Sequence, residues 1–208
     1  MSAITTKTVQ QPDSFAFTAE NVKIAEAYIA KYPAGREQSA VMPLLTLAQK
    51  QHQNWLPVKA IELVAKMCNM PYIRAYEVAS FYTMYNLAPV GRHLVQCCTT
   101  TPCWLRGSDE VVKACKDTLG IGFGETTRDG MFTLTEVECL GACVNAPMVQ
   151  VDGHDGSEIF YEDLDYASTR EILLQLKRNE KPKVGPQTAR TSSEPLPGLT
   201  SLTTIKAG

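Results

Sequence analysis

The sequence lacks any apolar run that approaches the length of a membrane-spanning helix, which needs about 20 residues. It also lacks an excess of charge of either sign, because 20 basic and 22 acidic residues leave a formal net charge of −2. Proteins that bind nucleic acid concentrate Lys and Arg on one face, and the sequence gives no sign of such a concentration. We therefore expect neither direct membrane insertion nor a nucleic-acid partner.

Targeting signals are also absent from the start of the chain. Residues 1–14 carry neither the apolar stretch of an export signal nor the arginines of a transit peptide. We therefore expect a soluble protein that works in the compartment where it is made. Structural disulfides then explain the seven cysteines poorly, because disulfides accumulate in exported proteins.

Four of the cysteines stand in two short pairs. Thr-Thr-Thr-Pro separates Cys98 from Cys103, and Leu-Gly-Ala separates Cys139 from Cys143. The stretch between the pairs, 104–138, is too long for one loop and fits one crossover unit of a sheet. In a reducing compartment, paired cysteines more often bind a metal or carry out redox chemistry than form disulfides.

The first half of the chain shows apolar residues at helical spacing, which predicts four short helices. Thr18 is expected to cap the first helix, and the second is expected to end near Gln51. Pro57 and Pro71 are expected to open the third and fourth, because proline is favoured in a first turn. Short helices joined by short loops predict a small helical bundle.

The second half alternates short strands with helices. Strands are expected at His93–Cys97, Met131–Glu138, Met148–Val151 and Glu158–Tyr161, with helices at Asp109–Leu119, capped by Ser108, and at Ser168–Lys177. A helical crossover joins the first two strands, so they should be parallel, with both cysteine pairs just beyond their carboxyl ends. A small sheet of this kind, flanked by helices, is a thioredoxin-like α/β fold.

After Lys181 the chain is rich in Pro, Gly, Ser and Thr and has little capacity to form its own core. From composition alone, this tail is either disordered or laid extended over a partner. The expected domains are a flexible N-terminus (1–17), a helical bundle (18–90), a thioredoxin-like domain (91–180) and an extended partner-binding tail (181–208).

Thiolates are soft ligands that suit iron–sulfur clusters, zinc and copper(I). A [2Fe–2S] cluster takes four thiolates in two pairs. Zinc modules usually leave about two residues between paired ligands, so the gaps of four and three residues favour the larger centre without excluding zinc. A Rieske centre needs two histidine ligands, and none of the three histidines falls in either pair. The Cys-x-x-Cys motif of a thiol–disulfide enzyme is absent.

A [2Fe–2S] cluster on four thiolates is negatively charged, so its loops must donate hydrogen bonds to sulfur. The run Thr99–Thr101 and the pair Gly141–Ala142 are expected to supply these donors. Cys97 adjoins Cys98 but should point to the opposite side of the strand, so we interpret it as a buried thiol. We interpret Cys68 and Cys115 as small core residues of helices.

Two further patterns have simpler explanations than a binding site. The stretch Gly120–Gly124 lacks the spacing of a dinucleotide fingerprint and follows a helix, so it is predicted to be a helix C-cap and turn. The acidic cluster of Glu158, Glu162, Asp163 and Asp165 is interpreted as a solvated face, with docking of a basic partner surface as the alternative.

Several motifs together resemble one family, the thioredoxin-like [2Fe–2S] subunits of respiratory complex I. This family comprises the E subunit of bacterial NADH:quinone oxidoreductase and the small flavoprotein subunit of the mitochondrial enzyme. The motifs are Cys98-Thr-Thr-Thr-Pro-Cys103, Glu138-Cys139-Leu-Gly-Ala-Cys143-Val-Asn-Ala-Pro-Met, Tyr161-Glu-Asp-Leu, Glu77-Val-Ala-Ser-Phe-Tyr-Thr-Met-Tyr-Asn86, Gly185-Pro186 and Glu194-Pro-Leu-Pro-Gly-Leu-Thr-Ser-Leu. The resemblance covers nearly the whole chain from about Phe15.

The resemblance implies an electron-transfer subunit with one [2Fe–2S] cluster, which exchanges single electrons with the flavin of a partner. The ligands that it implies are Cys98, Cys103, Cys139 and Cys143. FMN and NADH would bind only to the partner flavoprotein subunit, and the large iron–sulfur subunit would be a second partner. The expected location is the peripheral arm, on the cytoplasmic side of the bacterial inner membrane or the matrix side in an organelle.

Alternatives remain at this stage. Close relatives of the family serve NAD-linked hydrogenases and formate dehydrogenases, although the tail with Gly-Leu-Thr-Ser-Leu favours complex I. A structural zinc module on the same four cysteines is the alternative from another class. If the tail lies across the partner, deletion of residues 185–208 should weaken assembly without bleaching the cluster.

Overall fold

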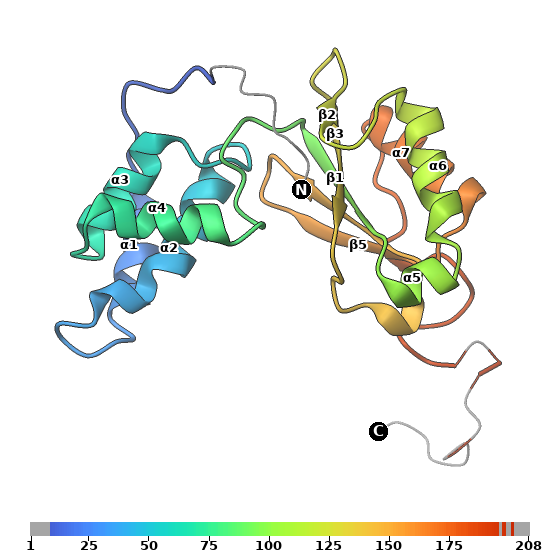
Figure 1. Cartoon of the computed structure of the whole chain (residues 1–208). Helices are drawn as coiled ribbons and strands as arrows, with labels where there is room; N and C mark the ends of the chain where they lie inside the picture. Colours follow the sequence, from blue (N-terminus) through green and yellow to red (C-terminus); the bar gives the residue numbers. More distant parts are fainter. Residues whose placement is uncertain (1–8, 196, 199–200, 202–208) are drawn as a thin grey trace. The chain divides into compact units, whose positions relative to one another are not determined.

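The computed structural model describes residues 9–195, 197–198 and 201 (Figure 1). The chain divides into two compact units. The first ends at Arg92 and also includes the turn Gly153–Ser157, and the second begins at His93. Each unit has a hydrophobic core of its own. No helix among the described residues is long and apolar enough to cross a bilayer.

The first unit is helical. Its elements are α1 (Ala19–Ile29), the 3-10 turn η1 (Glu37–Ala40), α2 (Val41–Gln51), α3 (Val58–Met67) and α4 (Tyr72–Phe81). The Thr18 hydroxyl accepts a hydrogen bond from the Asn21 amide, which confirms the expected cap. Pro57 and Pro71 each stand one residue before their helix rather than inside its first turn. The fully buried side chains at the centre of this core include Leu44, Leu45, Ile61 and Val64.

The second unit is built on a mixed sheet. Its strands are β1 (His93–Cys98), β2 (Glu125–Thr126), β3 (Phe132–Val137), β4 (Val149–Gly153), β5 (Glu158–Glu162) and β6 (Gly185–Pro186), in the spatial order β2-β3-β1-β4-β5-β6. Strands β1 and β3 are parallel, as predicted, and their register runs from His93 opposite Phe132 to Cys98 opposite Val137. The carboxyl ends of these two strands are therefore level. Strands β4 and β5 form an antiparallel pair, with Val149 opposite Tyr161.

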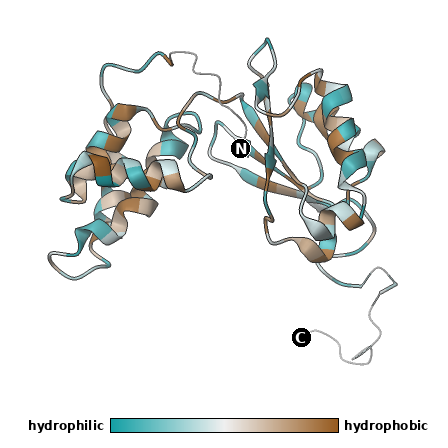
Figure 2. Ribbon diagram, viewed as in Figure 1, coloured by the Kyte–Doolittle hydropathy of each residue, from teal (hydrophilic) through white to brown (hydrophobic). Residues whose placement is uncertain are grey.

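The helices of this unit are α5 (Thr101–Leu105), α6 (Ser108–Leu119) and α7 (Tyr166–Lys177), with a 3-10 turn η2 at Cys143–Asn145. Helices α6 and α7 lie side by side against the sheet (Figure 1). Apolar and polar residues alternate around both helices, as expected where one side of a helix faces a core (Figure 2). Val95, Leu134 and Tyr161 are buried in the core between these layers.

The two ends of α6 differ in how well the sequence predicts them. Ser108 is not the cap, because Gly107 occupies that position with φ of +96° and the helix starts directly after it. Glycine adopts such a conformation without the steric penalty of a Cβ. The Ser108 hydroxyl is buried and has no hydrogen-bond partner among the described residues. At the other end, Gly120 caps the helix with φ of +66°, as predicted.

Helix α7 begins earlier than predicted because Asp165 forms a capping box with Ser168. The Asp165 carboxylate accepts from the Ser168 amide at 2.7 Å, and the Ser168 hydroxyl accepts from the Asp165 amide at 2.9 Å. Replacing Asp165 with alanine should lower the free energy of unfolding by about 1 kcal/mol. Urea denaturation measures this change, with Asp165→Asn as the control that keeps a capping oxygen. Equal losses in both variants would show that the cap is not the cause.

Candidate metal centre

The parallel pair β1 and β3 brings the two cysteine pairs to one end of the sheet. Cys98 is the last residue of β1, and Cys139 follows two residues after the end of β3. Helix α5 begins three residues after Cys98 and places Cys103 back against it. Cys143 starts the 3-10 turn η2. Each cysteine pair therefore spans a tight turn, and both turns follow directly on adjacent strands.

The four thiols form two pairs, and the charges of one pair also influence the pKa values of the other. The sulfurs of Cys139 and Cys143 lie 3.3 Å apart. Burial, followed by contact with the Cys98 thiol, raises the pKa of Cys103 to about 12, and the charge of Cys143 adds to this shift. The pKa of Cys143 is raised first by Cys139 and then by burial, with a further contribution from Cys98. The structure thus brings together all four cysteines singled out in the sequence.

The two pairs differ in their access to solvent. Cys98 and Cys103 are 2% and 1% exposed and form a small apolar cluster with Ala146 and Met148. Cys139 is exposed, and Cys143 is partly exposed. A centre held here would be anchored on a buried side by the first pair and closed on the solvent side by the second.

The donor set fits a two-metal cluster. Thiolates are the ligands of [2Fe–2S] clusters, and each iron takes two of them. The arrangement at the ends of β1 and β3 offers two such pairs. Within the described residues, no group of three or more His, Cys, Asp or Glu is close enough together to hold a metal ion, so the match to a cluster rests on the two thiol pairs and not on a preformed metal cage.

Two of the hydrogen-bond donors expected near sulfur are in place. The Thr100 hydroxyl lies 3.2 Å from the Cys98 sulfur. The Gly141 amide donates to the Cys139 sulfur at 3.4 Å, and this bond is the main cause of the lowered pKa of Cys139. Gly141 has φ of +86°, a conformation that favours glycine. The Thr99 hydroxyl donates instead to Glu136 at 2.8 Å.

The other three cysteines are buried, as predicted. Cys97 points away from Cys98, and its sulfur lies 3.7 Å from that of Cys115 on α6. Contact with Cys115, followed by burial, raises the pKa of Cys97 well above its usual value. Cys68 lies just past the end of α3, where burial raises its pKa to about 11. Cys97 therefore belongs to the core between β1 and α6.

The acidic cluster is the expected solvated face only in part, because Glu158 and Asp165 are exposed but Asp163 is not. The Asp163 side chain is only 3% exposed and forms an ion pair with Arg190, whose side chain is 7% exposed. The Glu162 carboxylate accepts a hydrogen bond from the Asn145 side chain. Arg190 lies 27 residues beyond its partner in the chain, so no local pattern could indicate the pair. Asn145 and Arg190 are the two residues near the cysteines that sequence reasoning missed.

The carboxyl group of Asp163 has a lowered pKa. Burial alone would raise this pKa, but hydrogen bonds from Arg190 and Thr188, with the positive charges of Arg190 and Arg106, more than offset it. The folded-state pKa therefore lies below the unfolded value of about 3.9. The ionised group stabilises the fold above that unfolded value, and this contribution is lost as the pH falls through the folded pKa.

We therefore expect a pH-dependent difference in stability between the native chain and Asp163→Asn. The native chain should be more stable by a constant amount between about pH 5 and pH 7, and the difference should shrink below about pH 4. Glu162 and Glu194 also face Arg190, so their protonation contributes to the same acid range in both proteins. Denaturant titrations of both proteins over this range measure the difference. A difference that persists unchanged into acid would contradict the assignment to Asp163.

The chain is similar in sequence to a known protein family and to individual proteins of known name. A family model described as thioredoxin-like [2Fe–2S] ferredoxin matches residues 25–177. The mitochondrial NADH dehydrogenase [ubiquinone] flavoprotein 2 of Dictyostelium discoideum is 53% identical over 188 residues, which cover 90% of this chain and 74% of the relative. The E subunit of the NADH-quinone oxidoreductase of Rickettsia typhi is 54% identical over 162 residues, which cover 78% of this chain and 92% of the relative.

Solved structures support the fold. An NAD+-reducing [NiFe]-hydrogenase, in a crystal structure of its H2-reduced state, matches with a TM-score of 0.56 and 19% identity. The match covers 67% of this chain and 23% of the hydrogenase chain. At this identity the likeness concerns the fold alone. Together with the family model, the mixed sheet and its helices confirm the thioredoxin-like ferredoxin fold expected from the sequence.

Proposed function

Because the chain belongs to the thioredoxin-like [2Fe–2S] ferredoxin family, we propose that it is the electron-transfer subunit of an NADH:quinone oxidoreductase, respiratory complex I. It holds one [2Fe–2S] cluster on Cys98, Cys103, Cys139 and Cys143. The observation that carries this proposal is the meeting of two cysteine pairs at the level carboxyl ends of β1 and β3. Relatives that are more than half identical over most of both chains carry complex I names, which supports the choice of enzyme.

The bound cluster supplies one-electron redox chemistry, and the chain's own residues set the conditions for it. The buried thiols of Cys98 and Cys103 anchor the inner side, while Cys139 and Cys143 close the outer side. The Thr100 hydroxyl and the Gly141 amide lie within hydrogen-bonding distance of sulfur and stabilise negative charge there. Hydrogen bonds to the sulfurs favour the reduced state and so raise the reduction potential.

The partners follow from the same proposal. A flavoprotein subunit binds FMN and NADH, the large iron–sulfur subunit neighbours it, and this chain binds neither FMN nor NADH itself. Trp104, Leu105 and Val144 are 58%, 71% and 68% exposed and flank the cysteine loops, so they are suited to packing against the flavoprotein subunit. The assembly lies in the peripheral arm, on the cytoplasmic side of a bacterial inner membrane or the matrix side of an organelle.

The remainder of the domain organisation is proposed on the same basis. Residues 18–90 form a helical bundle. Of the N-terminus over 1–17, expected to be flexible, residues 1–8 lie outside the described residues, and Phe17 is buried in the core of the helical unit. Residues 91–180 form the cluster-binding domain, followed by a partner-binding tail over 181–208, of which residues 196, 199–200 and 202–208 lie outside the described residues. The described section of this tail, up to Pro195, makes many contacts within its own domain.

An NAD-linked hydrogenase is the second candidate enzyme, because the hydrogenase chain shares the fold. The identity of 19% to that chain, against 53% and 54% to the complex I relatives, favours complex I. Co-purification of the chain with a quinone-reducing or a hydrogen-oxidising activity separates the two candidates.

The proposal is tested by spectra of the anaerobically purified protein before and after reduction with dithionite, together with iron and sulfide assays. A [2Fe–2S] protein absorbs in the visible, bleaches on reduction and then gives an electron paramagnetic resonance signal, with about two irons and two sulfides per chain. A colourless protein with one zinc and no sulfide, even after reconstitution, would leave a structural zinc module instead.

A further inference from the structure

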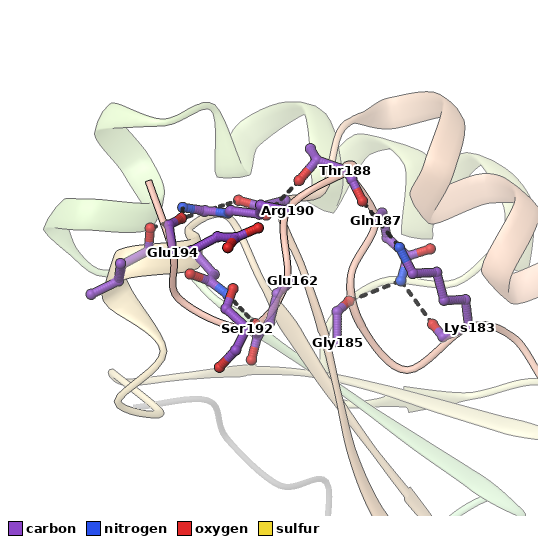
Figure 3. A network of polar contacts seen from close by, with 11 residues as sticks. Glu162, Lys183, Gly185, Gln187, Thr188, Arg190, Ser192 and Glu194 are labelled. Atoms are coloured by element: carbon purple, nitrogen blue, oxygen red, sulfur yellow. Dashed lines mark hydrogen bonds and ion pairs between the residues drawn. The ribbon is translucent and has the colours of Figure 1, made fainter. Parts of the chain in front are cut away.

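The tail after α7 returns to the sheet and lies beside the second cysteine turn. Strand β6 pairs with the end of β5, with Gly185 opposite Tyr161 and Pro186 opposite Glu162. The Gln187 amide then donates to the Glu162 carbonyl at 2.9 Å. The Gln187 side chain closes the turn by donating to the carbonyls of Lys183 and Gly185 (Figure 3).

Beyond this turn, Arg190 forms a buried fork with Asp163 at the end of β5. Its Nε donates to the Asp163 carboxylate at 2.6 Å, and its Nη2 donates to the second carboxylate oxygen. Thr188 donates to the same carboxylate at 2.9 Å (Figure 3). A planar guanidinium that meets a carboxylate through two parallel bonds is fixed in orientation as well as in position. Removing one member would leave the other charge buried without its partner.

The same guanidinium reaches the residues that follow Cys143. Arg190 Nη2 donates to the Val144 carbonyl at 3.0 Å. The Asn145 side chain donates to the Ser192 carbonyl at 2.9 Å and also to Glu162. The tail and the end of β5 therefore both hold η2 directly after the cysteine.

At Val144, the second residue of η2, polar contacts to the backbone hold the turn more than packing of the side chain does. The Val144 side chain is 68% exposed, so it contributes little buried apolar area to the position of the turn. The backbone of Asn145 is held as well, because its carbonyl accepts from the Asp163 amide at 2.7 Å. Asp163 thus links the turn to the tail through both its backbone and its side chain.

We propose that Arg190 is a positioning residue for Cys143: the tail clamps η2 through Arg190, Asp163 and Asn145, and this clamp keeps the cluster in place. The inference rests on the proposed function only for the identity of the bound group. It revises the expectation that deletion of residues 185–208 leaves the cluster unbleached. Such a deletion removes the clamp together with any contact that the end of the tail makes to a partner.

The first test compares Arg190→Ala with the control Lys183→Ala in the cluster-loaded chain. Lys183 lies in the same tail and is exposed, and its ammonium donates to the Thr188 carbonyl rather than to the cysteine turn. Loss of a residue that supports metal ligands from behind weakens metal retention by about 10–100-fold. We expect iron transfer to a chelator to accelerate by this factor in Arg190→Ala and to stay near the native rate in Lys183→Ala. Equal rates in the two variants would overturn the proposal.

Hydrogen exchange provides a readout that does not depend on the cluster. The amides of 139–146 should exchange faster in Arg190→Ala than in the native chain, with or without the cluster, while those of α6 should not change. If the native protein holds no cluster, the proposed function fails, yet the exchange rates still report on the clamp. Unchanged exchange over 139–146 would overturn the clamp even if iron is lost faster.

A second variant distinguishes loss of the clamp from misfolding caused by an unpaired buried charge. Asp163→Asn combined with Arg190→Leu removes both charges together, and such paired replacements are often tolerated. This double variant should fold. Its amides over 139–146 should nevertheless exchange, and its iron should be released, as fast as in Arg190→Ala. A chain that ends at Gly198 keeps Arg190 and should retain iron at the native rate, whereas a chain that ends at Val184 should not. Equal retention by the two truncated chains would contradict the proposal.

Discussion

Replacing Cys98 with alanine is expected to abolish the visible absorption of the purified protein, whereas replacing Cys97 with alanine should leave it in place. The two cysteines are adjacent, but they lie on opposite sides of β1. Cys98 packs with Cys103 in the apolar cluster at the end of the sheet. Cys97 packs with Cys115 on α6, in the core of the domain.

The two variants form a matched pair, because both remove one buried thiol from the same strand. Cys97 is 1% exposed and Cys98 is 2% exposed, so both replacements remove the same buried volume. A general loss of stability would therefore affect both, and only loss of a ligand affects one. Iron and sulfide assays on freshly purified protein measure the outcome. A cluster that survives in Cys98→Ala and disappears in Cys97→Ala would assign the ligand to Cys97.

The framework of the cysteine domain is predictable from the sequence because its signals are local. The alternation of apolar and polar residues over Met131–Glu138 predicts β3, and the amphipathic pattern of Asp109–Leu119 predicts the helix before it. A helical crossover makes the flanking strands parallel, and this alone brings the two cysteine pairs to the same end. The candidate cluster site is thus predictable from spacing and strand order.

The parts that could not be predicted depend on contacts between distant residues. Strand β6 is only Gly185–Pro186, too short for any periodicity, and it forms because the tail returns to β5. The pairing of Asp163 with Arg190 depends on the same return, and without it an acidic cluster is reasonably interpreted as solvated. The prediction of Ser108 as the cap of α6 is wrong because Gly107 turns the chain through a left-handed conformation, which leaves Ser108 buried.

The two hydrophobic cores are expected to differ in how strongly they affect the thermal stability of the cluster. Replacing Leu134 with alanine is expected to release the cluster at a temperature lower by about 10 °C or more, whereas replacing Leu44 should leave the temperature of cluster loss nearly unchanged. Both side chains are 0% exposed, and removal of a fully buried leucine side chain destabilises a fold by about 2–5 kcal/mol. Leu134 belongs to the core of the cysteine domain, and Leu44 to the core of the helical unit.

Comparison of the two variants shows whether the two units unfold separately. Visible absorption follows the cluster on heating, and far-ultraviolet circular dichroism follows the helices of both units. If the cores are independent, Leu44→Ala lowers the temperature of part of the circular dichroism transition, while the visible absorption persists to the native temperature. The reason is that the cavity left by Leu44 lies in a unit with its own core. If both probes shift together in both variants, the chain unfolds as one cooperative system. In that case the stability of the helical unit also limits retention of the cluster, and substitutions in the buried face of α2 would lower the temperature at which the cluster is lost.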